Sequence, residues 1–217
     1  MKKAFLLFVA ILTIHFAATA QTTRFGFTAG GTMASYKISA DNISITGDNK
    51  FGFTFGTLVD IPVSEKFSVQ PALNFVQKGM VTSDDFGGSG VTAKYKTSVS
   101  LIELPVNFLF NSGGFFVGAG PSVAFGVSGK GKTTYTDGSP DETIDLKFGN
   151  TENDDLKGLD LGANLLAGYR LSSGLMFSFN YNIGLSNLVP SPVDNEKMKS
   201  HYFGFRLGFL LGGDKKN

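Results

Sequence analysis

Ser200 and His201, two adjacent residues near the end of the chain, are of the types that hydrolases and acyltransferases use. In such sites a histidine exchanges a proton with a nearby nucleophile or carboxyl group. His201 has the same place in an alternating pattern as Phe203, so we expect its imidazole to face outward with the apolar side chains. A catalytic site would also need partners that the sequence does not place. We therefore assign no catalytic residue and expect no enzyme.

Two further segments have the composition of ligand sites without their spacing. Asn150–Asp155 is acidic enough to suggest Ca²⁺, but it lacks the D-x-[DN]-x-[DN]-G spacing of a calcium loop, and we expect a solvated loop. Gly118-x-Gly120 is not a nucleotide fingerprint, because it lies within a strand pattern and no helix follows. The sequence therefore predicts no metal site, no cofactor and no cofactor-binding residue.

Four charged residues form the remaining candidate: Glu103, Asp160, Arg170 and Arg206. Each alternates with bulky apolar neighbours, which places it on the less apolar face of its segment. The two acids and the two arginines could neutralise one another as a structural network, or they could gate a narrow path. The role of these four residues depends on the secondary structure in which they lie.

These elements are clearest in the segment Leu101–Val127, which predicts two strands joined by a tight turn at Asn111–Gly114. On the second arm, bulky residues such as Phe115 and Val117 alternate with glycine, serine and alanine. Such period-2 alternation marks a strand that lies between two environments. Six other segments repeat the pattern. The eight expected strands cover about residues 24–35, 51–63, 67–78, 95–110, 115–127, 158–171, 175–186 and 200–212.

The expected strands have the length and spacing of a membrane barrel. Each has about ten residues or more, enough for a tilted strand to cross a bilayer. The connections after the first, third, fifth and seventh strands are long and polar, whereas the others are short, as in outer-membrane barrels. Closing the sheet pairs both of its edges, which lipid requires. The predicted fold is all-β: an eight-stranded antiparallel up-and-down transmembrane β-barrel.

A soluble lipocalin-like barrel is the alternative fold. It would place bulky apolar residues inside, around a ligand, and polar residues outside. Here the less apolar face contains too many glycines for an outer surface. Charged residues are also only 17% of the chain, against about 25% in soluble domains. The pattern therefore favours a barrel in lipid.

In the predicted barrel, Glu103, Asp160, Arg170 and Arg206 face the lumen. Eight strands leave an interior just wide enough for side chains, and an unpaired charge there is costly. We therefore expect at least one of the two arginines to contact one of the two carboxylates, within a packed lumen that has no open pore.

The strand expected at 95–110 changes its parity. Val99 and Leu101 fall on odd positions, whereas the apolar residues from Ile102 to Phe110 fall on even positions. A β-bulge near Leu101–Glu103 would bring both sets onto one face, and we predict one there.

The first twenty residues have the features of a secretory signal peptide: a basic start, an apolar run at 4–17 and an Ala-Thr-Ala cleavage site ending at Ala20. We expect residues 21–217 to form one barrel domain. Without Lys2 and Lys3 the chain has 17 basic and 18 acidic residues, a balance that argues against nucleic-acid binding. The absence of cysteine excludes disulfides and thiolate metal sites.

Two paired segments carry a family resemblance. Ile102–Val106 (IELPV) and Phe116–Pro121 (FVGAGP), joined by a glycine-containing turn, resemble the core motif of the PorT-like outer-membrane β-barrel family. Tyr202–Phe209 (YFGFRLGF) is similar to the closing strand of that family. The resemblance covers residues 21–217 and implies the outer membrane of a Gram-negative cell. It implies no activity, because most members have none assigned, and the polar tail at 212–217 departs from the usual aromatic end.

Together these patterns predict a monomeric outer-membrane barrel with a structural or surface-interaction role. Its partners would be the lipid bilayer and, through the long loops, an external protein or glycan. A narrow small-solute channel is the main alternative. An outer-membrane enzyme and a soluble lipocalin-like binding barrel are the remaining ones.

Overall fold

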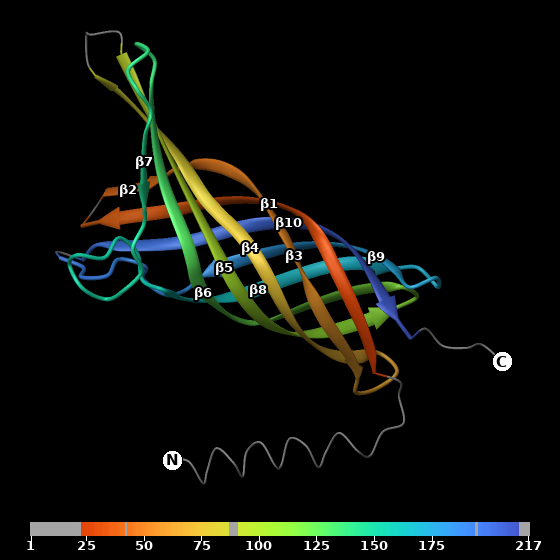
Figure 1. Cartoon of the computed structure of the whole chain (residues 1–217). Coiled ribbons are helices and arrows are strands. Elements are labelled where there is room, and N and C mark those ends of the chain that lie inside the picture. The colour runs from red at the N-terminus through yellow and green to blue at the C-terminus, as the bar shows by residue number, and fades with distance from the viewer. Residues whose placement is uncertain (1–22, 42, 87–90, 194, 213–217) are drawn as a thin grey trace.

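The computed structural model describes residues 23–41, 43–86, 91–193 and 195–212, and there the chain consists of β-strands joined by turns and loops (Figure 1). No helix in these ranges is long and apolar enough to cross a membrane. The signal peptide expected at residues 1–20 lies outside the described part of the chain. In order, the strands are β1 (Arg24–Ala40), β2 (Ile43–Thr46), β3 (Asp48–Pro62), β4 (Phe67–Phe86), β5 (Val91–Ser112), β6 (Phe115–Tyr135), β7 (Glu142–Asp145), β8 (Leu159–Arg170), β9 (Leu175–Gly184) and β10 (Lys197–Leu211).

Eight of these strands form a closed antiparallel ring. Neighbouring strands follow the order β10-β9-β8-β6-β5-β4-β3-β1, and β1 pairs with β10 to complete the circle. That last pairing runs from Phe25 opposite Leu211 to Ser39 opposite Lys197. β2 and β7 lie outside the ring, paired with β1 and β6. The eight-stranded up-and-down barrel predicted from the sequence is confirmed.

The register of the ring determines its width. Each residue of the ring is paired with a residue on the next strand. If these pairs are followed round the barrel from Asp160 of β8, the path returns to β8 at Arg170, so the strands are staggered by ten residues in one full turn. A stagger of this size over eight strands tilts them by about 40° and leaves an interior that side chains fill. Each residue therefore advances about 2.5 Å along the barrel axis.

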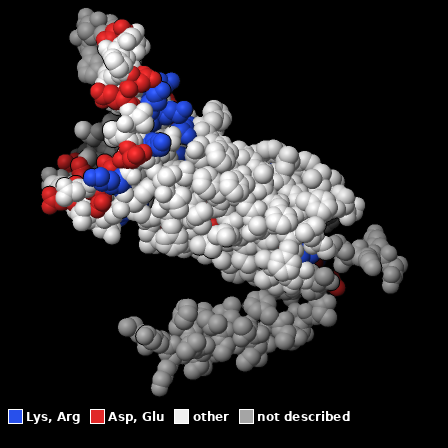
Figure 2. Space-filling model, viewed as in Figure 1, with Lys and Arg blue, Asp and Glu red and all other residues white. Residues whose placement is uncertain are grey.

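Side chains alternate between the outer wall and the lumen, as expected. In β9, Phe177 and Phe179 are exposed on the wall, whereas Ser178 and Asn180 are buried inside. On the face seen in Figure 2, the wall carries almost no charge, while acidic and basic residues gather at one end. The soluble lipocalin-like alternative is wrong, because the bulky apolar residues cover the outside of this barrel.

The strands extend further than the sequence pattern predicted. β4 continues to Phe86, β5 begins at Val91 and β6 continues to Tyr135. These polar segments lack bulky alternation, but their partner strands are already in register, so the ladder continues into water. In Figure 1 they project as a ribbon from the end of the barrel opposite the start of β1 and the end of β10.

The expected bulge in β5 is wrong. β5 keeps one register with β4, and Val99 and Leu101 are buried inside the barrel on the same face as Glu103. The shift lies between β5 and β6, where Ser100 pairs with Ser128 and Leu101 with Gly126. Val127 of β6 is therefore the extra residue, and β5 needs no change of face.

The tight turn between β5 and β6 is confirmed. Ser112 pairs with Phe115, which leaves Gly113 and Gly114 as a two-residue loop with φ of 57° and 92°. Positive φ at both positions belongs to the type I′ turn, whose twist matches that of the flanking strands. Glycine adopts this conformation without strain.

Phe179 provides a test of which face meets lipid. Its side chain is 65% exposed on the wall, near the middle of β9. Phe179→Arg should lower the free energy of unfolding by about 2–4 kcal/mol, because the guanidinium would lie near the middle of the bilayer. Urea titration of the protein in phospholipid vesicles measures this loss. Phe179→Leu is the control and should lose much less; equal stability of the two variants would show that this face does not meet hydrocarbon.

Candidate functional site

Lys78 is the centre of a buried charge cluster in the lumen. Its Nζ donates to Asp160 Oδ2 at 3.1 Å and to Ser200 Oγ at 3.3 Å, and it lies 3.9 Å from Glu103 Oε2. The side chains of Lys78, Glu103 and Asp160 are at most 4% exposed. Because all three are removed from water, each charge depends on the others for its stability.

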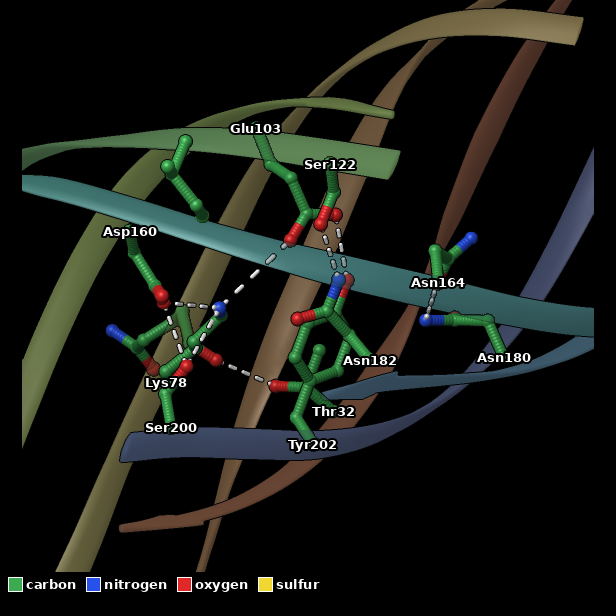
Figure 3. Close-up of polar contacts among 12 residues, drawn as sticks. Thr32, Lys78, Glu103, Ser122, Asp160, Asn164, Asn180, Asn182, Ser200 and Tyr202 are labelled. Atoms are coloured by element: carbon green, nitrogen blue, oxygen red, sulfur yellow. Dashed lines mark hydrogen bonds and ion pairs between the residues drawn. The ribbon is translucent and has the colours of Figure 1, made fainter. Parts of the chain in front are cut away.

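Tyr202 extends this cluster toward Arg206. Its hydroxyl donates to Glu103 Oε1 at 2.7 Å and accepts from Arg206 Nη2 at 3.3 Å. Lys78 Nζ also lies 5.0 Å from the centre of the Tyr202 ring, within the range of a cation–π contact. Figure 3 shows Lys78 among Glu103, Asp160, Ser200 and Tyr202. With Arg206, the cluster contains two cations and two carboxylates and has no net formal charge.

The walls of the barrel bring these side chains together from several strands. Glu103 on β5 and Asp160 on β8 are both register partners of Ala124 on β6. Ser200, on β10, is separated from β8 only by β9, and it donates to Asp160 Oδ2 at 2.6 Å (Figure 3). The Ser186 hydroxyl donates to the other oxygen, Oδ1, at 3.3 Å. Both carboxylate oxygens of Asp160 therefore have hydrogen-bond partners.

Apolar side chains cover the charge cluster at the end of the barrel that carries the ribbon. Tyr36, Val99 and Leu101 of the barrel pack with Leu156 and Leu188, which come from the loops. Each of these five residues is at most 7% exposed. The loops thus close this mouth of the barrel.

Amide side chains fill the middle of the lumen. Asn164 Nδ2 donates to Asn107 Oδ1 at 2.9 Å, and Asn164 Oδ1 accepts from Asn180 Nδ2 at 3.3 Å. A cavity of about 20 Å³ lies beside Asn180 and Arg206. It is large enough for one water molecule, and it is too small for a path along which solutes pass.

A second charge cluster lies near the other end. Asp60 Oδ2 accepts from Arg24 Nη2 at 2.6 Å and from Arg170 Nη1 at 3.1 Å. The Asp60 side chain is fully buried, and both arginine side chains are 18% exposed. Arg170 and Asp160 stand at the two ends of β8, so the two clusters are about 25 Å apart along the axis.

The structure therefore places the four expected lumen charges in two groups. Glu103, Asp160 and Arg206 belong to the first cluster, where Arg206 reaches Glu103 through Tyr202. Arg170 belongs to the second. The expected direct contact of an arginine with Glu103 or Asp160 is wrong, because Lys78 occupies that place.

Sequence reasoning missed Lys78 although a signal was present. Lys78 continues the inward parity of Asn74 and Val76 along β4. The expected strand ended at residue 78, and its last residue was not assigned to either face. Because the hydrogen bonding of β4 continues beyond its apolar residues, Lys78 lies within the strand and its side chain points into the lumen.

Ser200 and His201 do not form a catalytic pair. Adjacent residues of a strand point to opposite faces, and Ser200 is buried in the lumen while His201 is partly exposed on the outer side. In the acidic loop, Asp154 Oδ2 accepts from the backbone N–H and the hydroxyl of Thr151 at 2.8 and 2.6 Å. Within the described ranges, no group of three or more His, Asp or Glu side chains is placed to hold a metal ion.

The Lys78 cluster makes a prediction about stability. Lys78→Met should lower the free energy of unfolding by about 3–5 kcal/mol, because Glu103 and Asp160 would stay buried without their cation. Combining it with Asp160→Asn should cost less than the sum of the two single losses, since both partners are then removed. Urea unfolding in vesicles measures all three variants, and additive losses would show that the charges are solvated independently.

Lys132→Met is the matched control for this cycle. Lys132 pairs with Asp141 at 2.7 Å, but both side chains are 47% exposed in water. Loss of such a pair should change the free energy of unfolding by less than about 1 kcal/mol. A loss as large as that of Lys78→Met would mean that burial is not the reason for the effect.

Asp154 makes a prediction about pH. Hydrogen bonds from the side chain and backbone of Thr151 hold the pKa of the Asp154 carboxyl below its ordinary value of 3.8. They therefore stabilise the folded loop above the pKa of the unfolded chain, and this stabilisation is lost as pH falls through the lower folded pKa. The ¹³C shift of the carboxyl, followed by NMR in micelles, should titrate with a midpoint below 3.8. Thr151→Val should raise that midpoint, and an unchanged midpoint would contradict the assignment.

Comparisons with known proteins give a family and a general likeness of shape. A family profile described as "Outer membrane protein beta-barrel domain" matches residues 19–189. No curated protein sequence matches the chain.

Three solved structures illustrate the likeness. Ail, the attachment invasion locus protein of Yersinia pestis, solved in complex with the heparin analogue sucrose octasulfate, is 12% identical with a TM-score of 0.45, over 88% of this chain and 100% of that one. Neisserial surface protein A is 11% identical with a TM-score of 0.42, over 87% and 99%. OprG of Pseudomonas aeruginosa is 15% identical with a TM-score of 0.35, over 89% and 98%. At these scores the likenesses carry no argument about activity.

The family profile covers most of the chain, and it includes seven of the eight ring strands in full. It does not separate a PorT-like branch from other members. The chain belongs to the outer membrane protein beta-barrel domain family, and its location is the outer membrane.

Proposed function

We propose that the protein is a closed barrel that presents extended β-ribbons for contacts outside the cell. The projecting part of β4, β5 and β6 carries this proposal. Ile102 and its partner Phe125 lie near one edge of the apolar wall, and Lys96 is six residues beyond Ile102 on β5. The ribbon therefore rises about 15 Å above that edge at Lys96. Strands at this height have no part in crossing the membrane.

The filled lumen supports a closed barrel over the small-solute channel. Four groups of side chains follow one another along the barrel axis: the apolar residues packed around Leu156 and Leu188, the Lys78 cluster, the central amides and the Asp60 cluster. The cavity of about 20 Å³ within them is smaller than any common metabolite. An enzyme has less support, since Ser200 and His201 face opposite sides of the wall.

Three finer points belong to the same proposal. A monomer is supported by ring closure, which pairs every spanning strand on both sides within one chain. PorT-like membership is supported by IELPV and FVGAGP, which lie on the paired strands β5 and β6. A signal peptide at residues 1–20 is supported by the basic start, the apolar run and the Ala-Thr-Ala site.

Conductance tests the closed lumen. The protein reconstituted in a planar bilayer should show no steady single-channel openings at moderate voltage, because its polar interior is filled by side chains. A porin inserted under the same conditions provides the positive control. Regular openings of one size would favour the channel instead.

Shortening the ribbon tests the external role. Val81 and Lys96 are directly opposite each other, so replacing residues 82–95 by Asn-Gly joins them through a two-residue turn. The shortened barrel should still fold, because the removed residues lie above the apolar wall, and heat-modifiable gel migration verifies this. It should lose the molecules that crosslink to the wild-type protein on the cell surface. Unchanged crosslinking would contradict the role of the ribbon.

A further inference from the structure

Four lysines lie on the outward side of the ribbon formed by β5 and β6, which we call the lysine face. The register pairs Lys96 with Lys132 and Ser98 with Lys130, so Lys94 and Lys96 of β5 share one side with Lys130 and Lys132 of β6. All four are exposed. In Figure 2, blue and red side chains gather together at the end of the molecule that carries the ribbon.

This arrangement leaves positive charge uncompensated. Like charges directly across a strand pair repel, and Lys96 faces Lys132 in this way. Lys132 pairs with Asp141 at 2.7 Å, and Lys130 is opposite Asp145 of β7. Among the side chains that the structure describes, no carboxylate lies within ion-pair distance of Lys94 or Lys96. Across β5, β6 and the β7 side, four lysines thus meet two acids, Asp141 and Asp145, and the lysine face would be stabilised by an external anion.

The height of the lysine face excludes most of the bilayer as the source of that anion. Lys130 is level with Ser98, four residues beyond Ile102, and Lys94 is eight residues beyond Ile102. These steps place the face about 10 to 20 Å above the edge of the apolar wall. The headgroup layer of a bilayer is only about 6 Å thick on each side. A ligand of this face must extend above the membrane surface.

The side chains around the lysines indicate the chemistry of that ligand. Successive lysines on one strand are about 7 Å apart, and the hydroxyls of Ser98 and Thr134 continue the same two rows. Ammonium groups bind sulfate and phosphate, and hydroxyls exchange hydrogen bonds with sugar hydroxyls. Tyr95 and Tyr135 lie on the other side of the ribbon, so this face offers no aromatic platform for the bases of a nucleic acid.

We propose that the lysine face binds a sulfated or phosphorylated saccharide chain outside the membrane; this rests on the proposed role of the ribbon as an external contact surface. The chain lies along β5 and β6, with its anionic groups against Lys94 and Lys96. Asp141 and Asp145 limit its affinity from the β7 side, because they already neutralise part of the face.

Binding of a labelled heparin octasaccharide to the full-length protein in nanodiscs of neutral lipid tests the proposal. Fluorescence anisotropy should show binding that weakens as salt is added, since the charges are exposed. Lys94→Gln combined with Lys96→Gln should weaken binding about tenfold, and Asp141→Asn should strengthen it.

The chain offers a matched control for the loss of two lysines. Lys37 and Lys199 are another exposed pair directly opposite each other, on β1 and β10. Lys37→Gln with Lys199→Gln removes the same charge from a different part of the same end, and it should leave the affinity unchanged. Equal losses in the two double variants would overturn the proposal, as would a wild-type protein that shows no salt-sensitive binding.

Two competition arms separate the possible ligands. Anionic phospholipid added to the nanodiscs should not displace the octasaccharide, and a thymidine oligonucleotide of equal charge should bind more weakly. Displacement by the lipid, or tighter binding of the oligonucleotide, would overturn the saccharide assignment. If shortening the ribbon removes a crosslinked partner while the Lys94 and Lys96 substitutions leave binding unchanged, only the saccharide assignment fails and the external role stands.

Discussion

Backbone hydrogen bonding in lipid is the constraint on which the rest of this structure depends. A peptide N–H or C=O without a partner costs several kcal/mol in hydrocarbon, so a sheet that crosses a membrane must have no open edge. Here β1 and β10, the first and last strands, meet over the whole length from Phe25 to Ser39. That single pairing removes the last two edges. It also requires the ends of the chain to come together, although almost the entire sequence separates them.

Closure with eight strands makes the lumen narrow, and the narrowness accounts for its contents. Where backbones approach, only glycine fits: a Cβ on Gly30 would lie 1.9 Å from the Phe205 carbonyl oxygen. Where room remains, amides and hydroxyls bond with one another. The charges stand near the two ends: in the Lys78 cluster two cations meet two carboxylates, and in the Asp60 cluster two arginines share one carboxylate. A filled interior of this kind joins opposite walls of the barrel, and it supports a closed lumen.

Above the apolar wall the constraint disappears, because water can satisfy any backbone group. The strands nevertheless continue, since each already has a partner in register. The result is a ribbon with lysines on its outward side and tyrosines on the other. The same antiparallel ladder thus forms the barrel wall below and the ribbon above, and the proposed contacts outside the cell depend on the ribbon.

The sequence alone determined the number of ring strands, the tight turn at Gly113–Gly114 and the facing of the strands, except in β5, where Val99 and Leu101 point inward. These are local properties: a period of two residues, a run long enough to cross lipid, and glycines where φ is positive. The tertiary structure decided which lumen residues meet. Lys78 rather than an arginine neutralises Glu103 and Asp160, because the stagger of the ring brings β4 to their level and carries Arg170 to the opposite end. The place of the bulge, at Val127 rather than in β5, also came only from the pairing. Stagger and pairing are relations between strands that are distant in sequence. They cannot be predicted from the pattern of residues within a single strand.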